Sequence, residues 1–258
     1  MAINTNLKSL TPRREAYKRV ITLVSGGFYA PQALPGGQIT VYPWDTNIDA
    51  WFQERLRQPK RDFALWEVAE KVSNMNGISF KEMPIGDILT ILMVSRSILS
   101  DCVIEYTAVC PQCQRAHPDK VRIPDELVPV GKKGSDFKGT DSIVLPDSQD
   151  VVEVRVLSVG DEIGISDRSL EEKAVLPDSL AIILFSVATV GGGRPDSKEE
   201  AIAWYNALSP KDAEFLRKKR GELNPQLDPE LAIQCDNPDC KHKFTHTLEL
   251  QRDFFRGN

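Results

Sequence analysis

The chain has 258 residues, of which 41% are hydrophobic and 27% are charged, with a formal net charge of −5 and an isoelectric point near 5.4. These values are ordinary for a globular protein and argue against disorder as the main state. The excess of acidic side chains argues against a protein whose first task is to coat nucleic-acid phosphates. A protein partner fits this charge better.

The apolar runs argue against a membrane protein. The longest, at residues 180–190, is well short of the roughly 20 residues that a membrane-spanning helix needs. The run near the N-terminus covers only about five residues, too few for a signal-peptide core. We therefore expect a soluble protein that is made and kept in a cytoplasm. Five cysteines without a secretion signal then favour reduced thiols or metal ligands over disulfides.

The first part of the chain predicts a strand followed by helices. QITVYP at 38–43 is strand-like, DTNIDAWFQERL at 45–56 is an acidic helix start, and two helices follow at 64–74 and 84–99. In the last of these helices, apolar residues recur every three or four positions, which predicts one buried stripe. The stripe consists of Ile85, Ile88, Leu89, Leu92 and Met93.

Two cysteines then lie close together in CPQC at 110–113, directly after the strand-like sequence VIEYTAV. Residues 126–139, rich in Pro, Gly and charge, predict an exposed linker. After the linker the order of elements returns. VVEVRVLS at 151–158 predicts a strand, VGDEIGISD at 159–167 an acidic helix start, and SLAIILFSVATV at 179–190 a helix.

Two further helices are predicted from their first residues. Ser197 with Glu200 forms a capping-box pattern, and Ser209 is followed by Pro210 at the first helical position. A second cysteine pair then lies in CDNPDC at 235–240, ahead of the strand-like sequence KFTHTLEL.

The two cysteine pairs predict one metal site. Each pair lies in a proline-containing turn beside a strand, and two such turns can place four sulfurs around one Zn²⁺ whatever their distance along the chain. We predict a split zinc ribbon in which Cys110, Cys113, Cys235 and Cys240 hold a structural Zn²⁺. A site closed by four protein ligands serves folding rather than hydrolysis.

Alternatives to four sulfur ligands stay open. The thiols can pack together as small apolar groups without a metal. A histidine can also replace one cysteine, because all three histidines, His117, His242 and His246, lie near the pairs. We expect His242 and His246 on the solvent face of the last strand, and Cys102 as a buried core thiol.

The repeated order of elements predicts an α+β fold with two similar halves, 20–113 and 140–240, each ending in a cysteine pair. Chance repetition of a common order is the alternative. The corresponding division is an N-terminal half at 1–125, a linker at 126–139 and a C-terminal half at 140–258. The metal would join the ends of the two halves.

We expect no catalysis. Nucleophilic catalysis needs Ser or Cys beside His, and every histidine lies near the cysteine pairs. The acidic residues Asp45, Asp49, Asp161 and Glu162 are explained by helix starts, where the macrodipole favours negative charge. The basic run LRKKRGE at 216–222 is explained by a solvated helix end.

Four aromatic residues are predicted either to pack into the core or to contact a partner. These are Phe28, Tyr29, Phe254 and Phe255.

Four segments, VSGGFYAP, QITVYPWDTNIDAW, PIGDILTILMVSRSI and YTAVCPQC, occur in an order that resembles the base plate hub and assembly proteins of contractile-tailed, T-even-like bacteriophages. Gly27 and Tyr29 match that family's first segment approximately, as Asp87, Leu92 and Arg96 match its helix. The chain departs from the family in having VSGG where the family has Pro-Ser, and in its wide second cysteine pair.

The resemblance implies a structural or assembly protein that binds other tail components, including hub and tape-measure proteins. It would work in the cytoplasm of the infected bacterium, and a place in the finished virion base plate is compatible with this. The alternative is a zinc-ribbon nucleic-acid-binding regulator that uses a basic face around Arg217, Lys218, Lys219 and Arg220.

Overall fold

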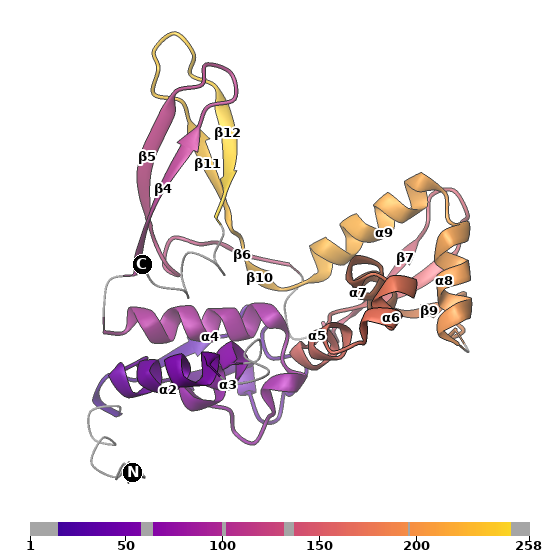
Figure 1. The fold of residues 1–258 in the computed structure, drawn as a ribbon, viewed down its shortest axis with the longest axis horizontal. Helices are drawn as coiled ribbons and strands as arrows, with labels where there is room; N and C mark the ends of the chain where they lie inside the picture. Colours follow the sequence, from indigo (N-terminus) through magenta and orange to yellow (C-terminus); the bar gives the residue numbers. More distant parts are fainter. Residues whose placement is uncertain (1–14, 58–63, 100–101, 132–136, 196, 249–258) are drawn as a thin grey trace.

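The computed structural model describes residues 15–57, 64–99, 102–131, 137–195 and 197–248. It has two bodies of helices and small antiparallel sheets, and a ribbon of two hairpins projects from them (Figure 1). A main hydrophobic core fills the first body, and two smaller clusters fill the second. The predicted α+β class is confirmed.

The first body carries a three-stranded antiparallel sheet with strand order β1-β2-β3. Its strands are β1 (Arg19–Thr22), β2 (Gln38–Val41) and β3 (Ser73–Asn74), and its helices are α2 (Thr46–Leu56), α3 (Ala64–Lys71) and α4 (Ile85–Ser97), with the 3-10 turns η2 (Pro35–Gly37) and η4 (Phe80–Glu82). Helix α2 begins where predicted, because the Asp45 carboxylate accepts the N–H groups of Asn47 and Ile48. Helix α3 ends earlier than predicted, because Ser73 and Asn74 pair with β2 instead.

Helix α4 lies between the rest of the first body and the base of the ribbon (Figure 1). The predicted stripe is buried at Ile88, Leu92 and Met93. Burial is not confined to this stripe, because Ile91, Val94 and Ser95 on other faces are buried as well. Gly86 in the first turn permits this packing. A Cβ there would lie 1.9 Å from the Pro225 carbonyl oxygen, so only glycine lets the helix approach this chain segment.

The loop before η2 is attached to α4 through a buried carboxylate. Asp87 accepts the Ser25 backbone N–H at 2.9 Å and also the Ser25 hydroxyl. Burial raises the pKa of Asp87 to about 6, although the bonds from Ser25 act in the opposite direction. The neighbouring Tyr29 packs against the main core, and Phe28 packs on Phe137 with ring centroids 5.0 Å apart. Both aromatic side chains therefore pack against other residues of the chain.

This carboxylate predicts a pH dependence of stability. Because the pKa of Asp87 is raised in the folded chain, its stabilising contribution is complete below its ordinary pKa near 4 and is lost as the pH rises through about 6. Going from pH 7 to pH 5, the wild type should gain about 1 kcal/mol of unfolding free energy relative to Asp87→Asn. Urea unfolding of both chains at the two pH values measures this difference, and a difference that does not change with pH would contradict it.

The second body also has a three-stranded antiparallel sheet, with order β7-β8-β9. Its strands are β7 (Thr140–Val144), β8 (Val151–Arg155) and β9 (Val187–Val190), and its helices are α5 (Val159–Ser166), α6 (Leu170–Val175), α7 (Asp178–Ser186), α8 (Lys198–Ala207) and α9 (Pro210–Leu223). The helix predicted at 179–190 is wrong in its last part. Residues 187–190 form β9, because they pair with β8.

The predicted helix starts of this body are confirmed. Ser197 accepts the Glu200 N–H, and Ser209 precedes Pro210 at the first position of α9. Asp161 completes a reciprocal capping box with Ser158 at the start of α5. The acidic start predicted there is therefore explained by capping.

The predicted exposed linker is partly built into the fold. Leu127 is buried in the main core, and β6 (Pro129–Val130) pairs with β10 (Gln226–Leu227), while residues 132–136 lie outside the described part. The two bodies also touch directly, because the Val159 N–H donates to the Met83 carbonyl oxygen at 2.9 Å. The linker segment thus helps to hold the base of the ribbon.

Candidate metal centre

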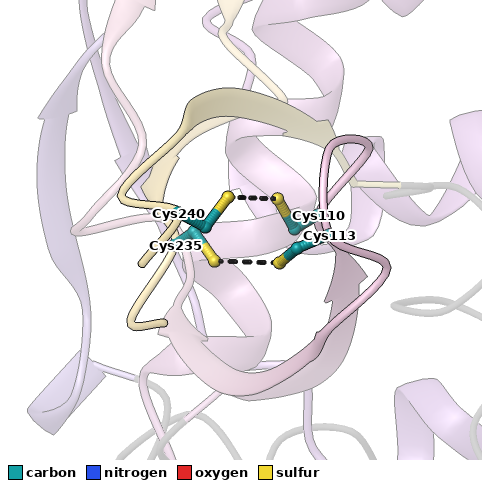
Figure 2. Close-up of side chains that lie close together, drawn as sticks. All are labelled: Cys110, Cys113, Cys235 and Cys240. Carbon is teal, nitrogen blue, oxygen red and sulfur yellow. Dashed lines mark hydrogen bonds between the residues drawn. The ribbon is translucent and has the colours of Figure 1, made fainter. Parts of the chain in front are cut away.

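The ribbon consists of two antiparallel hairpins that come from distant parts of the chain. The first joins β4 (Val103–Val109) to β5 (Ala116–Arg122), and the second joins β11 (Glu230–Gln234) to β12 (Lys243–Thr247). Both cysteine pairs lie in the turns at the free end of the ribbon, where the hairpins face one another (Figures 1 and 2).

All four predicted sulfurs come together. The Sγ atoms of Cys110, Cys113, Cys235 and Cys240 lie within 4.8 Å of one another. Across the hairpins, Cys110 Sγ lies 3.8 Å from Cys240 Sγ, and Cys113 Sγ lies 3.5 Å from Cys235 Sγ (Figure 2). A disulfide would need about 2.0 Å. Tetrahedral Zn²⁺ with bonds of about 2.3 Å places its sulfurs about 3.8 Å apart, so the four cysteines could hold a metal ion such as zinc.

The two turns share a backbone pattern despite their different lengths. The Cys110 N–H donates to the Arg115 carbonyl oxygen at 2.9 Å, and the Cys235 N–H donates to the His242 carbonyl oxygen at 2.8 Å. The residue after the second cysteine is left-handed in both turns, with φ of 58° at Gln114 and 49° at Lys241. The matching bonds orient both pairs of sulfurs toward the same point.

The additional residues of the second turn form their own hydrogen bonds. The Asp239 N–H donates to the Asn237 side chain at 3.1 Å, and the Cys240 N–H donates to the Asn237 carbonyl oxygen at 3.0 Å. These bonds to Asn237 turn the chain between Cys235 and Cys240 back toward the first cysteine. The unusual separation of Cys235 and Cys240 is thus compatible with convergence of the four sulfurs.

The four thiols are electrostatically unequal. The backbone N–H of Arg115 lowers the pKa of Cys113 to about 7, whereas burial raises the pKa of Cys235 to about 12. Four thiolates at these separations repel one another unless a cation lies between them. A divalent metal ion with affinity for sulfur would remove this repulsion, so the chemistry of the donor set also fits zinc.

His117 lies beside the sulfur cluster without joining it. Its ring nitrogen can form a ligand group only with Cys235 and Asp236 among the described residues. His117 Nδ1 lies 3.3 Å from Asp236 Oδ1, and Arg115 Nε lies 3.0 Å from the same oxygen. Two side chains of the first hairpin therefore contact one carboxylate of the second, next to the four cysteines. The geometry favours four sulfurs over a histidine replacement.

The prediction for His242 and His246 is wrong. His246 in β12 and His242 directly before it lie on the same half-buried side as Phe244, because residues two apart in an extended strand point to the same side. The His246 ring stacks on Tyr106 of β4, with centroids 5.0 Å apart and an angle of 13° between the planes. The histidines help to pack the two hairpins against each other.

Cys102 lies outside the cluster. It packs against the main core as predicted, although it is half-buried rather than buried. Because it is a cysteine of the same chain that does not belong to the four-sulfur group, it provides a matched control for substitutions at the centre.

Comparisons of the chain with protein-family models, with curated proteins and with solved structures found no match. Within the described residues, no helix is both long enough and apolar enough to cross a bilayer.

Proposed function

We propose that this chain is a non-catalytic structural or assembly protein of a phage tail base plate, stabilised by one Zn²⁺ on Cys110, Cys113, Cys235 and Cys240. The observation that carries the proposal is the meeting of two cysteine turns that are 122 residues apart, measured from Cys113 to Cys235. Four sulfur ligands close the coordination shell, so no position is left for a reactive water.

The metal acts on the arrangement of the chain. The free energy of binding Zn²⁺ becomes folding free energy, on the order of 10 kcal/mol in small zinc modules. Because the hairpins follow different bodies, the ion joins the two parts of the chain at the ribbon. The three-stranded sheets with the same sequential strand order support the idea of two similar halves, at 20–113 and 140–240.

The base plate assignment rests on the order of short motifs that resembles the phage family. The packing of the chain is compatible with these motifs forming one unit, because Ser25 of VSGGFYAP binds Asp87 of PIGDILTILMVSRSI. The chain would bind hub, tape-measure or other base plate proteins in the cytoplasm of the infected bacterium.

Co-purification tests this role. The chain should associate with at least one tail component when they are expressed together, and Cys110→Ser should weaken that association while Cys102→Ser leaves it unchanged. The reason is that Cys110 is one of the four proposed zinc ligands that join the two hairpins, whereas Cys102 is not. The absence of any association in a complete set of tail components would contradict the proposal.

The structure offers little support for the nucleic-acid alternative. Arg217 Nε donates to the Tyr205 hydroxyl at 3.3 Å, and Lys219 Nζ lies 2.7 Å from a Glu222 carboxylate oxygen. Arg220 is half-buried, and burial lowers its pKa. Two side chains of the basic run therefore have partners within the chain, and a third is partly withdrawn from solvent.

A gel-shift titration with duplex and single-stranded DNA and with RNA should accordingly show no complex that weakens steeply with salt, because Arg217 and Lys219 of the basic run have partners within the chain and Arg220 is half-buried. A complex whose affinity falls by orders of magnitude between low and physiological salt, and which is lost in Lys218→Glu, would instead favour the regulator.

A further inference from the structure

The first body has an open sheet edge. Strand β1 pairs with β2 and with no other described strand. The Leu23 N–H donates to the Gly37 carbonyl oxygen at 2.9 Å, in continuation of the β1–β2 register. Because antiparallel strands alternate between bonded and non-bonded pairs, Ile21 faces β2 as well, and the main-chain groups of Val20 and Thr22 point outward.

The side chains of this edge are also unusual. Val20 is 62% exposed, although Ile21 and Leu23 on the other face of the strand pack into the main core. An exposed strand edge presents unpaired main-chain groups, which the backbone of another extended chain can pair with even over the four residues of β1.

A groove lies at the C-terminal end of β1. It has a volume of about 730 Å³, and Thr22 and Leu23 at the end of β1 form part of its wall. Most of the remaining lining is apolar, including Phe28, Leu34 and Phe137. Lys138 supplies the one charged side chain among the described lining residues.

We propose that the β1 edge and this groove together bind an extended segment of a partner protein. The segment adds to β1 as a strand through the outward groups of Val20 and Thr22, places a large apolar side chain in the groove, and directs a carboxylate to Lys138. The inference rests on the proposed function, because it gives the chemistry of the segment that a tail component would present.

Two features select this occupant. The outward main-chain donors and acceptors of β1 are satisfied by an extended backbone and not by a helix. The positive charges of Lys138 and of exposed Arg19 favour an acidic segment.

The test is selection of peptides from a random twelve-residue display library on the full-length chain. The expected peptides alternate in polarity and carry at least one large apolar residue and one acidic residue. Thr22→Pro removes an outward donor at an edge that tolerates proline, and should weaken the selected peptides about tenfold or more. Thr22→Val keeps the donor and should bind as the wild type does, and Lys138→Glu should weaken binding without altering the sheet.

Several results would overturn the docking site. These are a failure to enrich any peptide, equal binding by Thr22→Pro and Thr22→Val with no effect of Lys138→Glu, or slow hydrogen exchange at the amides of Val20 and Thr22 in the isolated chain. Slow exchange would mean that the chain's own termini or a second copy already covers the edge.

Co-purification distinguishes this failure from failure of the base plate role. If a tail component still binds the folded Thr22→Pro and Lys138→Glu chains, the proposed function is supported and the docking site is contradicted. If the selected peptides bind as expected but no tail component binds the chain, the docking site is supported and the base plate role is contradicted.

Discussion

Replacing Cys235 by serine is expected to abolish metal binding and to lower the free energy of unfolding by on the order of 5 to 10 kcal/mol. The substitution leaves three sulfurs where a closed structural site needs four ligands. It also removes the sulfur that lies 3.5 Å from Cys113 across the hairpins. Denaturant unfolding, with and without a chelator, measures the loss.

Cys102→Ser is the matched control for this experiment, because Cys102 lies outside the sulfur cluster. It should cost no more than about 1 kcal/mol and should remain sensitive to the chelator. Equal losses in the two variants would show that the effect belongs to cysteine removal in general. A Cys235→Ser chain as stable as the wild type would show that the centre does not stabilise the fold.

Replacing Gly86 by alanine is expected to lower the free energy of unfolding by about 3 kcal/mol or more. The new Cβ would lie 1.9 Å from the Pro225 carbonyl oxygen, so α4 and the segment that leads to β10 would have to separate. Because this contact lies at the base of the second hairpin, we also expect the variant to bind metal more weakly. Urea unfolding and a metal titration check both effects.

Replacing the exposed Gly164 of α5 by alanine is expected to change the free energy of unfolding in the opposite direction. A Cβ on Gly164 meets no atom within 4 Å, so Gly164→Ala should raise the free energy of unfolding by about 0.5 to 1 kcal/mol through its better helix propensity. If both alanine variants changed stability in the same direction, the close approach of α4 to Pro225 would not be the cause.

Local sequence signals predicted the parts of the fold that depend on local physics. The capping residues Asp45, Ser197 and Ser209 begin helices as expected, since a cap needs only neighbouring N–H groups. The four cysteines of the centre were also predictable, because turn-forming prolines and paired thiols are visible in the sequence. The prediction that they converge followed from the preference of Zn²⁺ for four ligands.

Tertiary pairing decided the parts that local signals missed. Residues 187–190 continue an apolar helical pattern but form β9, because β8 offers a partner strand. Helix α4 showed a stripe in sequence but is covered on further faces by segments distant in the chain, among them the one at Pro225. The contacts of Asp236 with Arg115 and His117 join residues more than a hundred positions apart, and no local signal could indicate them.

The error on β12 had a different origin. The alternation of that strand places His242 and His246 on the same face as Phe244, and this was available from the sequence positions alone. The face is half-buried rather than solvated, because the first hairpin covers it with Tyr106 and His117. Assigning these histidines to the same face as Phe244 would have predicted their packing role.

Metal content combined with thiol accounting tests the central claim most directly. The protein should be purified without added zinc, analysed for metals, and titrated with a thiol reagent while folded and after chelation. We predict one Zn²⁺ per chain, with the four thiols of Cys110, Cys113, Cys235 and Cys240 becoming reactive as the ion is removed. A folded chain without metal, in which all five thiols react freely, would contradict the split zinc ribbon.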